Sequence, residues 1–244
     1  MKCRPRPRHT IWNAIWRWAT IVGIIAAAVI IVFYLRRKDR PVESEALSVS
    51  GMIDGYAYVD MGLPSGLKWA ICNIGASSLE EYGSLFAWGE TTTKEDEYFW
   101  DNYKWCDGSF FSFTKYNFEG MYGSVDNKNS LDLTDDAACA NWGGSWRMPT
   151  EADFQELIDN CIFIWTTHNG AIGYKVKSKS NRNILFFPAV KSTGTNPSYF
   201  GWYWSSSLGS STPLFSRIFF FSESYYCVGS SCRDEGLPVR PVAE

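Results

Sequence analysis

Histidine is scarce in this sequence: the 244-residue chain has two, and His168 is the only one after residue 40. A lone His in a turn-like segment, here followed by Asn169 and Gly170, is most often solvated rather than catalytic or metal-binding. The sequence also lacks G-x-S-x-G and H-E-x-x-H motifs and a glycine-rich phosphate loop. We therefore expect no catalytic residue, no metal site, no cofactor and no enzymatic activity.

Basic residues are few outside the N-terminus. Residues 1–40 hold nine Lys or Arg and one Asp, although the whole chain has a formal net charge of −3, so the remainder is acidic. Because phosphate binding requires a basic surface, nucleic acid is not expected as a partner. The length predicts one domain or at most two. Aromatic residues make up 17% of the chain, which is enough for one sizeable core.

An uncharged segment at residues 19–35 (ATIVGIIAAAVIIVFYL) predicts one transmembrane helix that serves as a signal anchor. Four basic residues between positions 36 and 40 end it abruptly. A cleaved signal peptide and a buried core helix are the alternatives. No small-residue cleavage site follows, however, and core helices rarely lack polar residues for so long. Long C-terminal domains translocate largely regardless of flanking charge, so we expect a periplasmic or extracellular C-terminal domain.

The predicted organisation is a basic segment (1–18), the transmembrane helix (19–35), a polar juxtamembrane linker (36–50) and one domain (51–244). From Gly51 onward, short apolar runs alternate with clusters of Gly, Ser, Asn and Asp, which is typical of small antiparallel sheets. A hairpin with a five-residue loop is predicted from 57–61 and 67–71. Further strands are predicted at 174–177, 184–188, 203–206, 217–221 and 239–242.

Two short helices complete a predicted α+β fold. The first begins after Thr150, the expected N-cap, with Asp153 at its third position. Its apolar stripe consists of Phe154, Leu157, Ile158 and Cys161. The second is expected to begin at Thr134, with acidic residues in its first turn, where the helix dipole favours anions.

The acidic stretch is a candidate calcium site because it offers several oxygen ligands. It consists of Asp126, Asn127, Asn129, Asp132, Asp135 and Asp136. The spacing matches no EF-hand loop. A solvated loop followed by a helix N-terminus explains it as well, and we favour that interpretation.

Six of the seven Cys follow the predicted membrane helix: Cys72, Cys106, Cys139, Cys161, Cys227 and Cys232. Six thiols can pair in fifteen ways. Cys139 and Cys161 lie among apolar residues, so we expect buried free thiols there. The Cys227-x4-Cys232 spacing suggests either a local disulfide or a thiolate pair for a soft metal.

Six segments follow one another in an order known from one family. They are residues 58–70 (YVDMGLPSGLKWA), 86–92 (FAWGETT), 103–106 (YKWC), 141–150 (NWGGSWRMPT), 203–207 (YWSSS) and 239–242 (VRPV). Together they resemble the Fibrobacter succinogenes major paralogous domain, which is common in gut Bacteroidetes. That family is related to the C-type lectin fold and to formylglycine-generating enzymes. The resemblance implies a C-type lectin-like fold with two short helices, small antiparallel sheets and much loop.

The last two segments bracket a region that diversity-generating retroelements rewrite in their variable proteins, in which a lectin-fold scaffold displays a ligand-binding surface. The resemblance implies such a variable region at 203–242. Positions that resemble the family's fixed ones are Trp204, Phe219, Phe221, Arg233, Gly236, Val239 and Arg240. The candidate ligand-binding positions, which resemble the free ones, are Gly209, Ser211, Thr212, Leu214, Phe215, Arg217, Phe220, Tyr225, Cys227, Gly229, Ser230, Cys232, Asp234 and Glu235.

The residue pattern by itself also indicates a contact surface here. If Phe219 and Phe221 face the core, strand alternation turns Phe220 outward. We expect one exposed aromatic and cationic patch made of Phe215, Arg217, Phe220 and Tyr225. Such patches offer large contact area at little entropic cost. The alternative is that these rings close a second small core beneath the loops.

Three functions are compatible with the sequence. The favoured one is a membrane-anchored, surface-displayed protein that binds a protein or glycan ligand through residues 208–235. Its scaffold would be braced by Trp69, Trp88, Trp142, Trp146 and Trp204. Neither a Glu-Pro-Asn nor a Trp-Asn-Asp triplet is present, so calcium-dependent sugar binding is not expected.

The second function is a copper enzyme resembling the formylglycine-generating family, with Cys227 and Cys232 as its thiolate pair. The arginine- and asparagine-rich tail that accompanies that pair in the enzymes is absent here. The third function is a passive surface or adhesin domain.

Overall fold

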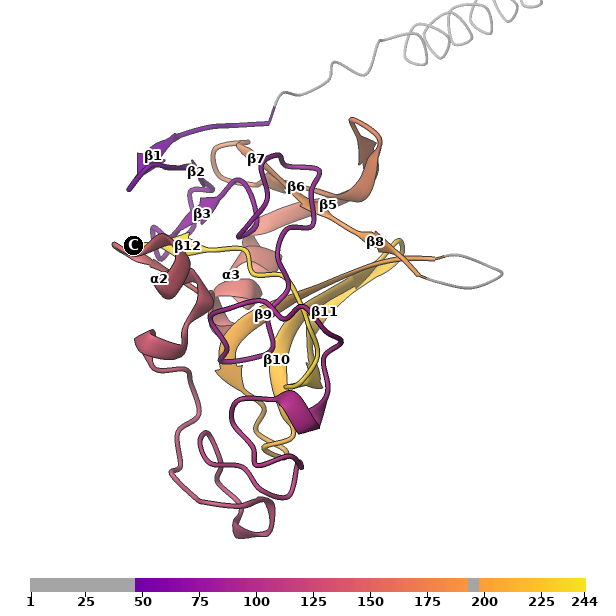
Figure 1. Ribbon diagram of the computed structural model, residues 1–244. Helices are drawn as coiled ribbons and strands as arrows, with labels where there is room; N and C mark the ends of the chain where they lie inside the picture. The colour runs from indigo at the N-terminus through magenta and orange to yellow at the C-terminus, as the bar shows by residue number, and fades with distance from the viewer. Residues whose placement is uncertain (1–46, 193–197) are drawn as a thin grey trace, which may run out of the picture. The chain divides into compact units, whose positions relative to one another are not determined.

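The computed structural model describes residues 47–192 and 198–244 (Figure 1). The predicted membrane helix at 19–35 and most of the predicted linker lie outside the described residues. Within the described ranges, no helix has both the length and the apolar character needed to cross a membrane. Residues 46–244 form one compact unit, and Ser48 and Ser50 already hydrogen bond to Ile184 and Tyr58 of that unit.

The described part is an α+β domain built from three small antiparallel sheets, as predicted (Figure 1). The first has the order β1 (Gly51–Ile53), β2 (Tyr56–Asp60), β3 (Lys68–Ala70), β12 (Val242–Ala243), β4 (Trp146–Arg147). The second has the order β11 (Tyr225–Cys232), β10 (Phe215–Ser222), β9 (Tyr199–Leu208), β8 (Val190–Lys191). The third has the order β5 (Cys161–His168), β6 (Ala171–Ser178), β7 (Ile184–Pro188). The C-terminal strand β12 therefore lies inside the first sheet, between β3 and β4.

The predicted hairpin is confirmed, because β2 and β3 pair antiparallel with Tyr58 opposite Ala70 and Asp60 opposite Lys68. The predicted strand 184–188 coincides with β7. The predicted final strand at 239–242 is wrong in extent, since β12 begins only at Val242. The preceding residues run extended through the core instead, where the carbonyl of Val239 accepts a hydrogen bond from Ile74.

Strand β5 was not predicted, although its turn has a clear signal. The β5–β6 hairpin closes through Asn169 and Gly170, which have φ angles of 45° and 91°. An Asn-Gly pair with two positive φ angles is the preferred two-residue hairpin turn. His168 thus ends a strand, and its Nε2 lies 3.4 Å from Oε1 of Glu80.

The helix after Thr150 is confirmed as α3 (Glu151–Asn160), with a capping box between Thr150 and Asp153. Its Phe154 and Leu157 side chains are buried, but Cys161, the last residue of the predicted stripe, begins β5. The second helix, α2 (Ala137–Trp142), begins three residues later than predicted. The reason is that the Asp136 carboxylate caps it, accepting from the N–H groups of Ala138 and Cys139.

The core lies between α3 and the sheets and is dominated by rings. The Phe154 ring stacks on Phe219 at 5.2 Å and lies 5.3 Å from Trp69, measured between ring centroids. Four of the five predicted bracing tryptophans are buried: Trp69, Trp88, Trp146 and Trp204. The fifth, Trp142, is half-buried and stacks on Tyr56.

Arg240 joins separate parts of this core. Its guanidinium is fully buried and donates to Oδ1 of Asn73 at 2.7 Å, to the carbonyl of Ala70 at 3.3 Å and to the carbonyl of Phe186 at 3.1 Å. The Phe187 ring lies 4.7 Å from the guanidinium carbon. One side chain therefore connects β3, β7 and the segment that precedes β12.

We expect Arg240→Met to lower the free energy of unfolding by about 3 kcal/mol, because three buried acceptors would each lose a hydrogen bond. Denaturant titration of the purified chain measures this loss. Arg182→Met, the same substitution at an exposed position, should change stability by less than about 0.5 kcal/mol. Equal stability of the two variants would contradict the role given to Arg240.

Candidate ligand-binding surface

Six of the seven positions that resemble fixed ones in the variable region are buried, and Gly236 is half-buried. Trp204, Phe219, Phe221, Arg233, Val239 and Arg240 are all fully buried. Gly236 is constrained by space, since a Cβ atom there would lie 2.5 Å from the Tyr98 ring. The residues at these positions pack within the scaffold. The side chains between them point elsewhere.

The fourteen candidate positions are mostly accessible. All except Gly209 and Asp234 are exposed or half-exposed. Ten of them surround one end of the β10–β11 hairpin, namely Gly209, Ser211, Thr212, Leu214, Phe215, Arg217, Ser230, Cys232, Asp234 and Glu235. The other four, Phe220, Tyr225, Cys227 and Gly229, lie farther along the hairpin.

The prediction of one shared patch is wrong, because its four side chains lie on opposite faces of the sheet. Strand alternation places Phe215 and Arg217 on the same face as the buried Phe219. Phe220 points the other way and lies 6.5 Å from the ring of Tyr225. None of the four side chains is buried. The hairpin therefore presents two separate surfaces, one on each face of the sheet, instead of the single predicted patch.

The α3-side surface is centred on Arg217, which lies on β10. Its Nη2 donates to Oε1 of Glu151 at 2.7 Å, and its Nη1 donates to the hydroxyl of Ser230 at 2.9 Å. Its Nε is buried without a hydrogen-bond partner among the described residues. With Phe215 and Cys232 paired alongside, this surface presents a cation, a ring and hydroxyl groups together.

The aromatic face, on the opposite side of the sheet, consists of Phe200, Trp202, Phe220 and Tyr225. Neighbouring ring centroids lie 5.2 Å apart for Phe200 and Trp202 and 5.7 Å apart for Trp202 and Phe220. The Tyr225 side chain is 56% exposed. Three adjacent strands thus present a continuous row of rings.

Arg233 holds the loops that flank the β10–β11 hairpin. Its fully buried guanidinium donates to Oη of Tyr103 at 3.0 Å. It also donates to the carbonyls of Tyr116 at 3.0 Å, Pro213 at 3.1 Å and Lys115 at 3.2 Å. The ring of Phe113 lies 4.4 Å from the guanidinium carbon. The loop before β10 and the loop after β11 are therefore attached to the segment around 103–116.

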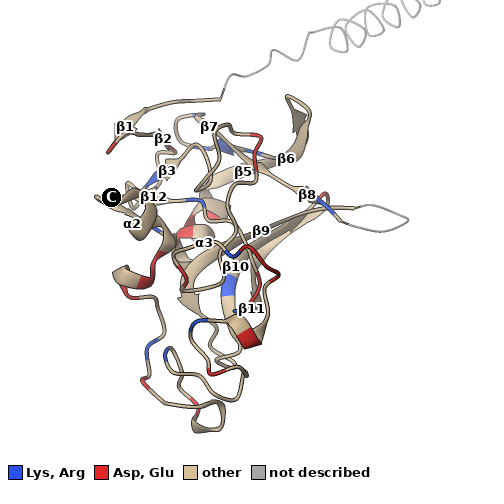
Figure 2. Cartoon of the chain, viewed as in Figure 1, with Lys and Arg blue, Asp and Glu red and all other residues tan. Residues whose placement is uncertain are grey.

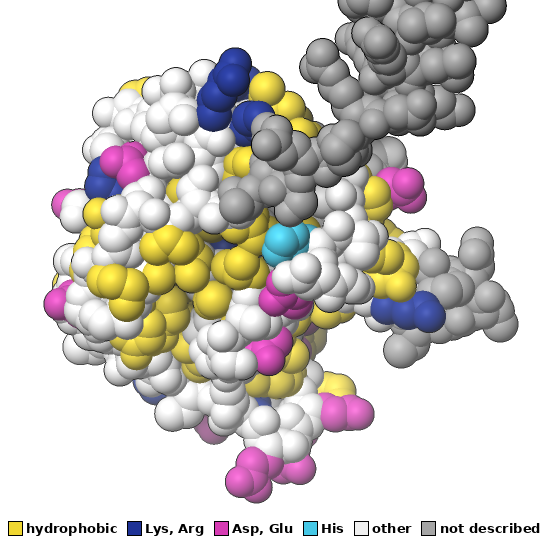
Figure 3. All heavy atoms as spheres, turned by 90° about the horizontal axis from the view of Figure 1, so that it is seen from above, with side chains coloured by type: hydrophobic (Ala, Val, Ile, Leu, Met, Phe, Trp, Pro, Cys, Tyr) yellow, Lys and Arg dark blue, Asp and Glu magenta, His cyan; other side chains and the backbone are white. Residues whose placement is uncertain are grey.

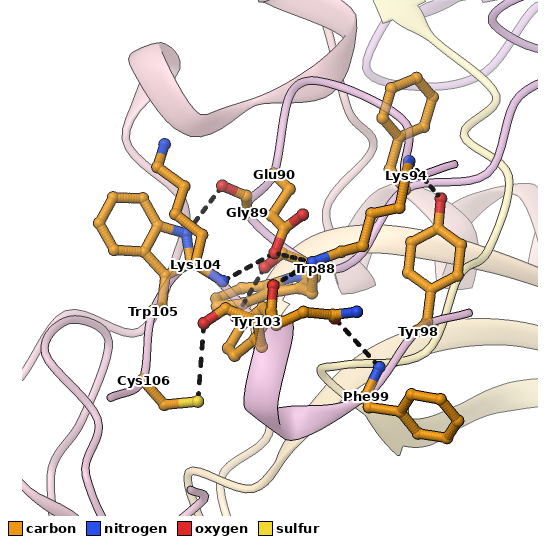
Figure 4. Close-up of polar contacts among 12 residues, drawn as sticks. Trp88, Gly89, Glu90, Lys94, Tyr98, Phe99, Tyr103, Lys104, Trp105 and Cys106 are labelled. Carbon is orange, nitrogen blue, oxygen red and sulfur yellow. Dashed lines mark hydrogen bonds and ion pairs between the residues drawn. The ribbon is translucent and has the colours of Figure 1, made fainter. Parts of the chain in front are cut away.

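A polar network around Glu90 fixes the segment behind Arg233 (Figure 4). Oε1 of the buried Glu90 accepts hydrogen bonds from Nζ of Lys94 at 2.9 Å and from the backbone N–H of Lys104 at 2.8 Å. The Tyr103 hydroxyl donates to the carbonyl of Trp88 at 2.7 Å. The positions of Tyr103 and Trp88 beside Arg233 are thus set by bonds within the loop.

The acidic stretch is engaged internally, and Asp135 and Asp136 are buried instead of lying in the solvated loop favoured from the sequence. The Asp126 carboxylate accepts from the backbone N–H groups of Tyr116 and Asn117. Hydrogen bonds from Lys115 and Lys128 lower the pKa of Asp132. Asp135 accepts from Lys115 and from the Tyr116 hydroxyl, and Asp136 caps α2.

The alternative of a Cys227–Cys232 pair, which the sequence left open, does not fit the geometry of strand β11. Five residues of extended strand separate the two thiols by about 16 Å, far beyond the span of a disulfide or a shared metal ion. Alternation also places them on opposite faces, with Cys227 near Phe220 and Cys232 opposite Phe215. All six cysteines of the described domain are free thiols. Cys161 is buried, as expected, and burial raises its pKa to about 12.

An apolar cavity of about 520 Å³ lies beside the first sheet. Its walls include Met52, Tyr56, Ile71, Cys72 and Trp142. Apolar side chains gather on the face seen from above in Figure 3. Burial raises the pKa of the Cys72 thiol, so this wall carries little nucleophilic thiolate.

Asp234 is the one buried carboxyl on the α3-side surface. Its Oδ1 has no hydrogen-bond partner within the described ranges. Burial, with Glu235 contributing, raises its pKa from 3.8 to about 6. Lys94 acts in the opposite direction.

We expect Asp234→Asn to be more stable than the natural chain at pH 7 and to lose that advantage at pH 4. With a raised pKa, the folded state holds a proton that the unfolded state releases between about pH 4 and 6, so the natural chain loses stability as pH rises through this window. Melting temperatures measured from pH 4 to 7 test this. A constant difference between the two proteins would contradict it.

Oxidation of the folded chain should give no disulfide between Cys227 and Cys232, and iodoacetamide should leave Cys161 unmodified until the chain unfolds. The first follows from the opposite faces of β11 and the second from burial and the raised pKa. Peptide mass mapping under native and denaturing conditions measures both. A native 227–232 crosslink would overturn the described register.

Searches of known protein families, curated proteins and solved structures find no match to this chain. The likeness to the Fibrobacter succinogenes major paralogous domain stays a prediction from sequence, and so does the C-type lectin fold. Function is therefore argued from the two surfaces of the hairpin and the scaffold that holds them.

Proposed function

We propose that the chain is a membrane-anchored, surface-displayed ligand-binding protein of the C-type lectin fold, resembling the variable proteins of diversity-generating retroelements. The β10–β11 hairpin and its flanking loops would bind a protein or glycan ligand. The proposal rests mainly on one observation: six of the seven positions that resemble fixed ones are buried, whereas twelve of the fourteen candidate positions are at least partly exposed.

The loops are held in a way that is largely independent of their side chains. Three of the four acceptors of Arg233 are main-chain carbonyls, which any residue at those positions supplies. Trp204 likewise donates its Nε1–H to the carbonyl of Phe86. Substitutions at Ser211, Thr212 or Glu235 would therefore leave the loop supports in place, as a replaceable binding surface requires.

The accessible side chains are suited to recognition. Arg217 and Phe215 on one face, and Phe220 and Tyr225 on the other, are of the types that dominate binding energies at interfaces. The surrounding Ser and Gly residues supply adaptable hydrogen bonds at low entropic cost. Two short helices, small antiparallel sheets and long loops agree with the expected lectin-like architecture.

The separation of Cys227 and Cys232 removes the thiolate pair on which the copper-enzyme alternative depended. A passive surface domain is the remaining alternative. It differs from a receptor in having no hairpin-dependent ligand.

The test uses full-length chain on glycan and extracellular-protein arrays with one double variant for each face. We expect either Phe215→Ala with Arg217→Ala, or Phe220→Ala with Tyr225→Ala, to weaken binding at least tenfold, since truncating an interface anchor costs about 2 kcal/mol. Phe99→Ala with Arg182→Ala, which removes an exposed ring and an exposed cation elsewhere, is the matched control.

Melting temperatures of all three variants should stay near that of the natural chain. If both hairpin variants bind as the natural chain does, the proposed surface is wrong. If no ligand binds at all, the passive domain is favoured.

A further inference from the structure

A groove of about 590 Å³ lies where the start of α3 meets the end of β9. It is formed by side chains from distant parts of the chain, among them Phe118, Asn129, Glu151 and Ser210. Of the fourteen candidate positions, the groove includes only Gly209. It is therefore a separate feature that adjoins the proposed surface. Its volume is within the range of small-ligand sites.

The groove is rich in uncharged hydrogen-bonding groups that are available to a ligand. The side chains of Asn127, Asn129 and Ser210 make no hydrogen bond within the described residues, and all three are exposed. Each amide offers donors and an acceptor, and each hydroxyl offers both. Such a set complements a ligand whose own groups both donate and accept, which is the property of sugar hydroxyls.

The charges of the groove select against anions. No Lys or Arg lines it, and its one ionisable side chain is the Glu151 carboxylate. Arg217 is already bonded to Oε1 of Glu151 and to Ser230, and Lys128, which lies between Asn127 and Asn129 in the chain, is paired with Asp132. A phosphate or a sulfated ligand would meet a carboxylate without a free cation. The half-buried ring of Phe118 adds an apolar wall for the C–H face of a sugar.

A second groove of about 770 Å³ continues from the first along α3. The two share Thr150, Glu151 and Ser207. The second is lined by Gln155 and Asn160 and by carboxylates, again without Lys or Arg. The shared residues make a continuous polar track, longer than a single sugar unit needs.

We propose that this double groove binds a neutral oligosaccharide along the start of α3. Amide and hydroxyl groups hold the sugar hydroxyls, and Phe118 packs against one ring face. This site uses side chains other than those of the hairpin surfaces, so it holds whether or not those surfaces bind a ligand.

The experiment titrates full-length chain with neutral gluco-, xylo- and chito-oligosaccharides of two to four units and with sulfated counterparts, by calorimetry. Neutral oligosaccharides should bind, more tightly with increasing length, and sulfated ones should not. Ser210→Tyr, which fills the groove, and Asn129→Leu, which removes an amide, should each weaken binding at least tenfold. Ser224→Tyr, at an exposed position in the β10–β11 turn, is the matched control and should bind normally.

Three outcomes would overturn the proposal: no neutral oligosaccharide binds, sulfated ones bind as well, or both groove variants keep full affinity. Affinity that does not grow with length would exclude the second groove. Loss of binding in the Phe215 and Arg217 double variant, with Ser210→Tyr unaffected, would assign the sugar to the hairpin surface instead. Unchanged melting temperatures of the groove variants show that any loss is local.

Discussion

The loop-bearing end of this domain depends on one buried cation, the guanidinium of Arg233. A buried charge is costly unless its hydrogen bonds are met. Here neutral oxygens accept its N–H groups, and the rings of Phe113, Trp88 and Tyr103 lie around it. Because most of its acceptors are carbonyls, the cation fixes where the backbone runs without specifying which side chains the loops carry. The contacts that fix the scaffold are therefore independent of the side chains that form the surface.

The acidic character of the domain follows from how its loops are held. Glu90, Asp126 and Asp136 each accept a hydrogen bond from a backbone N–H group in a segment without regular structure, and Asp136 also caps α2. In Figure 2 the acidic residues accordingly follow the loops instead of gathering on one face. Net charge led to the expectation that nucleic acid is not a partner, but it carried little information about the ligand. Most of these carboxylates serve the chain itself.

Local patterns predicted local structure well. The capping box at Thr150 and the strand at 184–188 each depend on neighbours within a few residues, and each is confirmed. Phe220 lies on the opposite face of β10 from Phe219, as alternation predicts, but it is half-buried against a second core cluster that contains Trp204 and Ile218. The single patch failed although alternation already separated Phe215 and Arg217 from Phe220. Exposure alone does not place side chains on one surface, because neighbouring residues of a strand point to opposite faces.

Other features of the structure could not be predicted from any local sequence pattern. Strand β11 contains Gly, Ser and Cys instead of a clear alternation, so nothing indicated that Cys227 and Cys232 lie on one extended strand. The groove at α3 combines side chains from 118–130, 150–151 and 207–210, which only the tertiary fold brings together. Its residues are unremarkable polar ones in the sequence.

The uninterrupted pairing of β10 with β11 has a consequence for how this region can change. Because side chains alternate along a strand, exchanging one accessible residue for another changes the chemistry of one face and leaves the register unchanged. Adding or removing a single residue would transfer every later side chain of that strand to the opposite face, driving Phe219 and Phe221 out of the interior. The accessible positions of the segment can thus change in composition, whereas its buried positions and the length of its strands are constrained by the core.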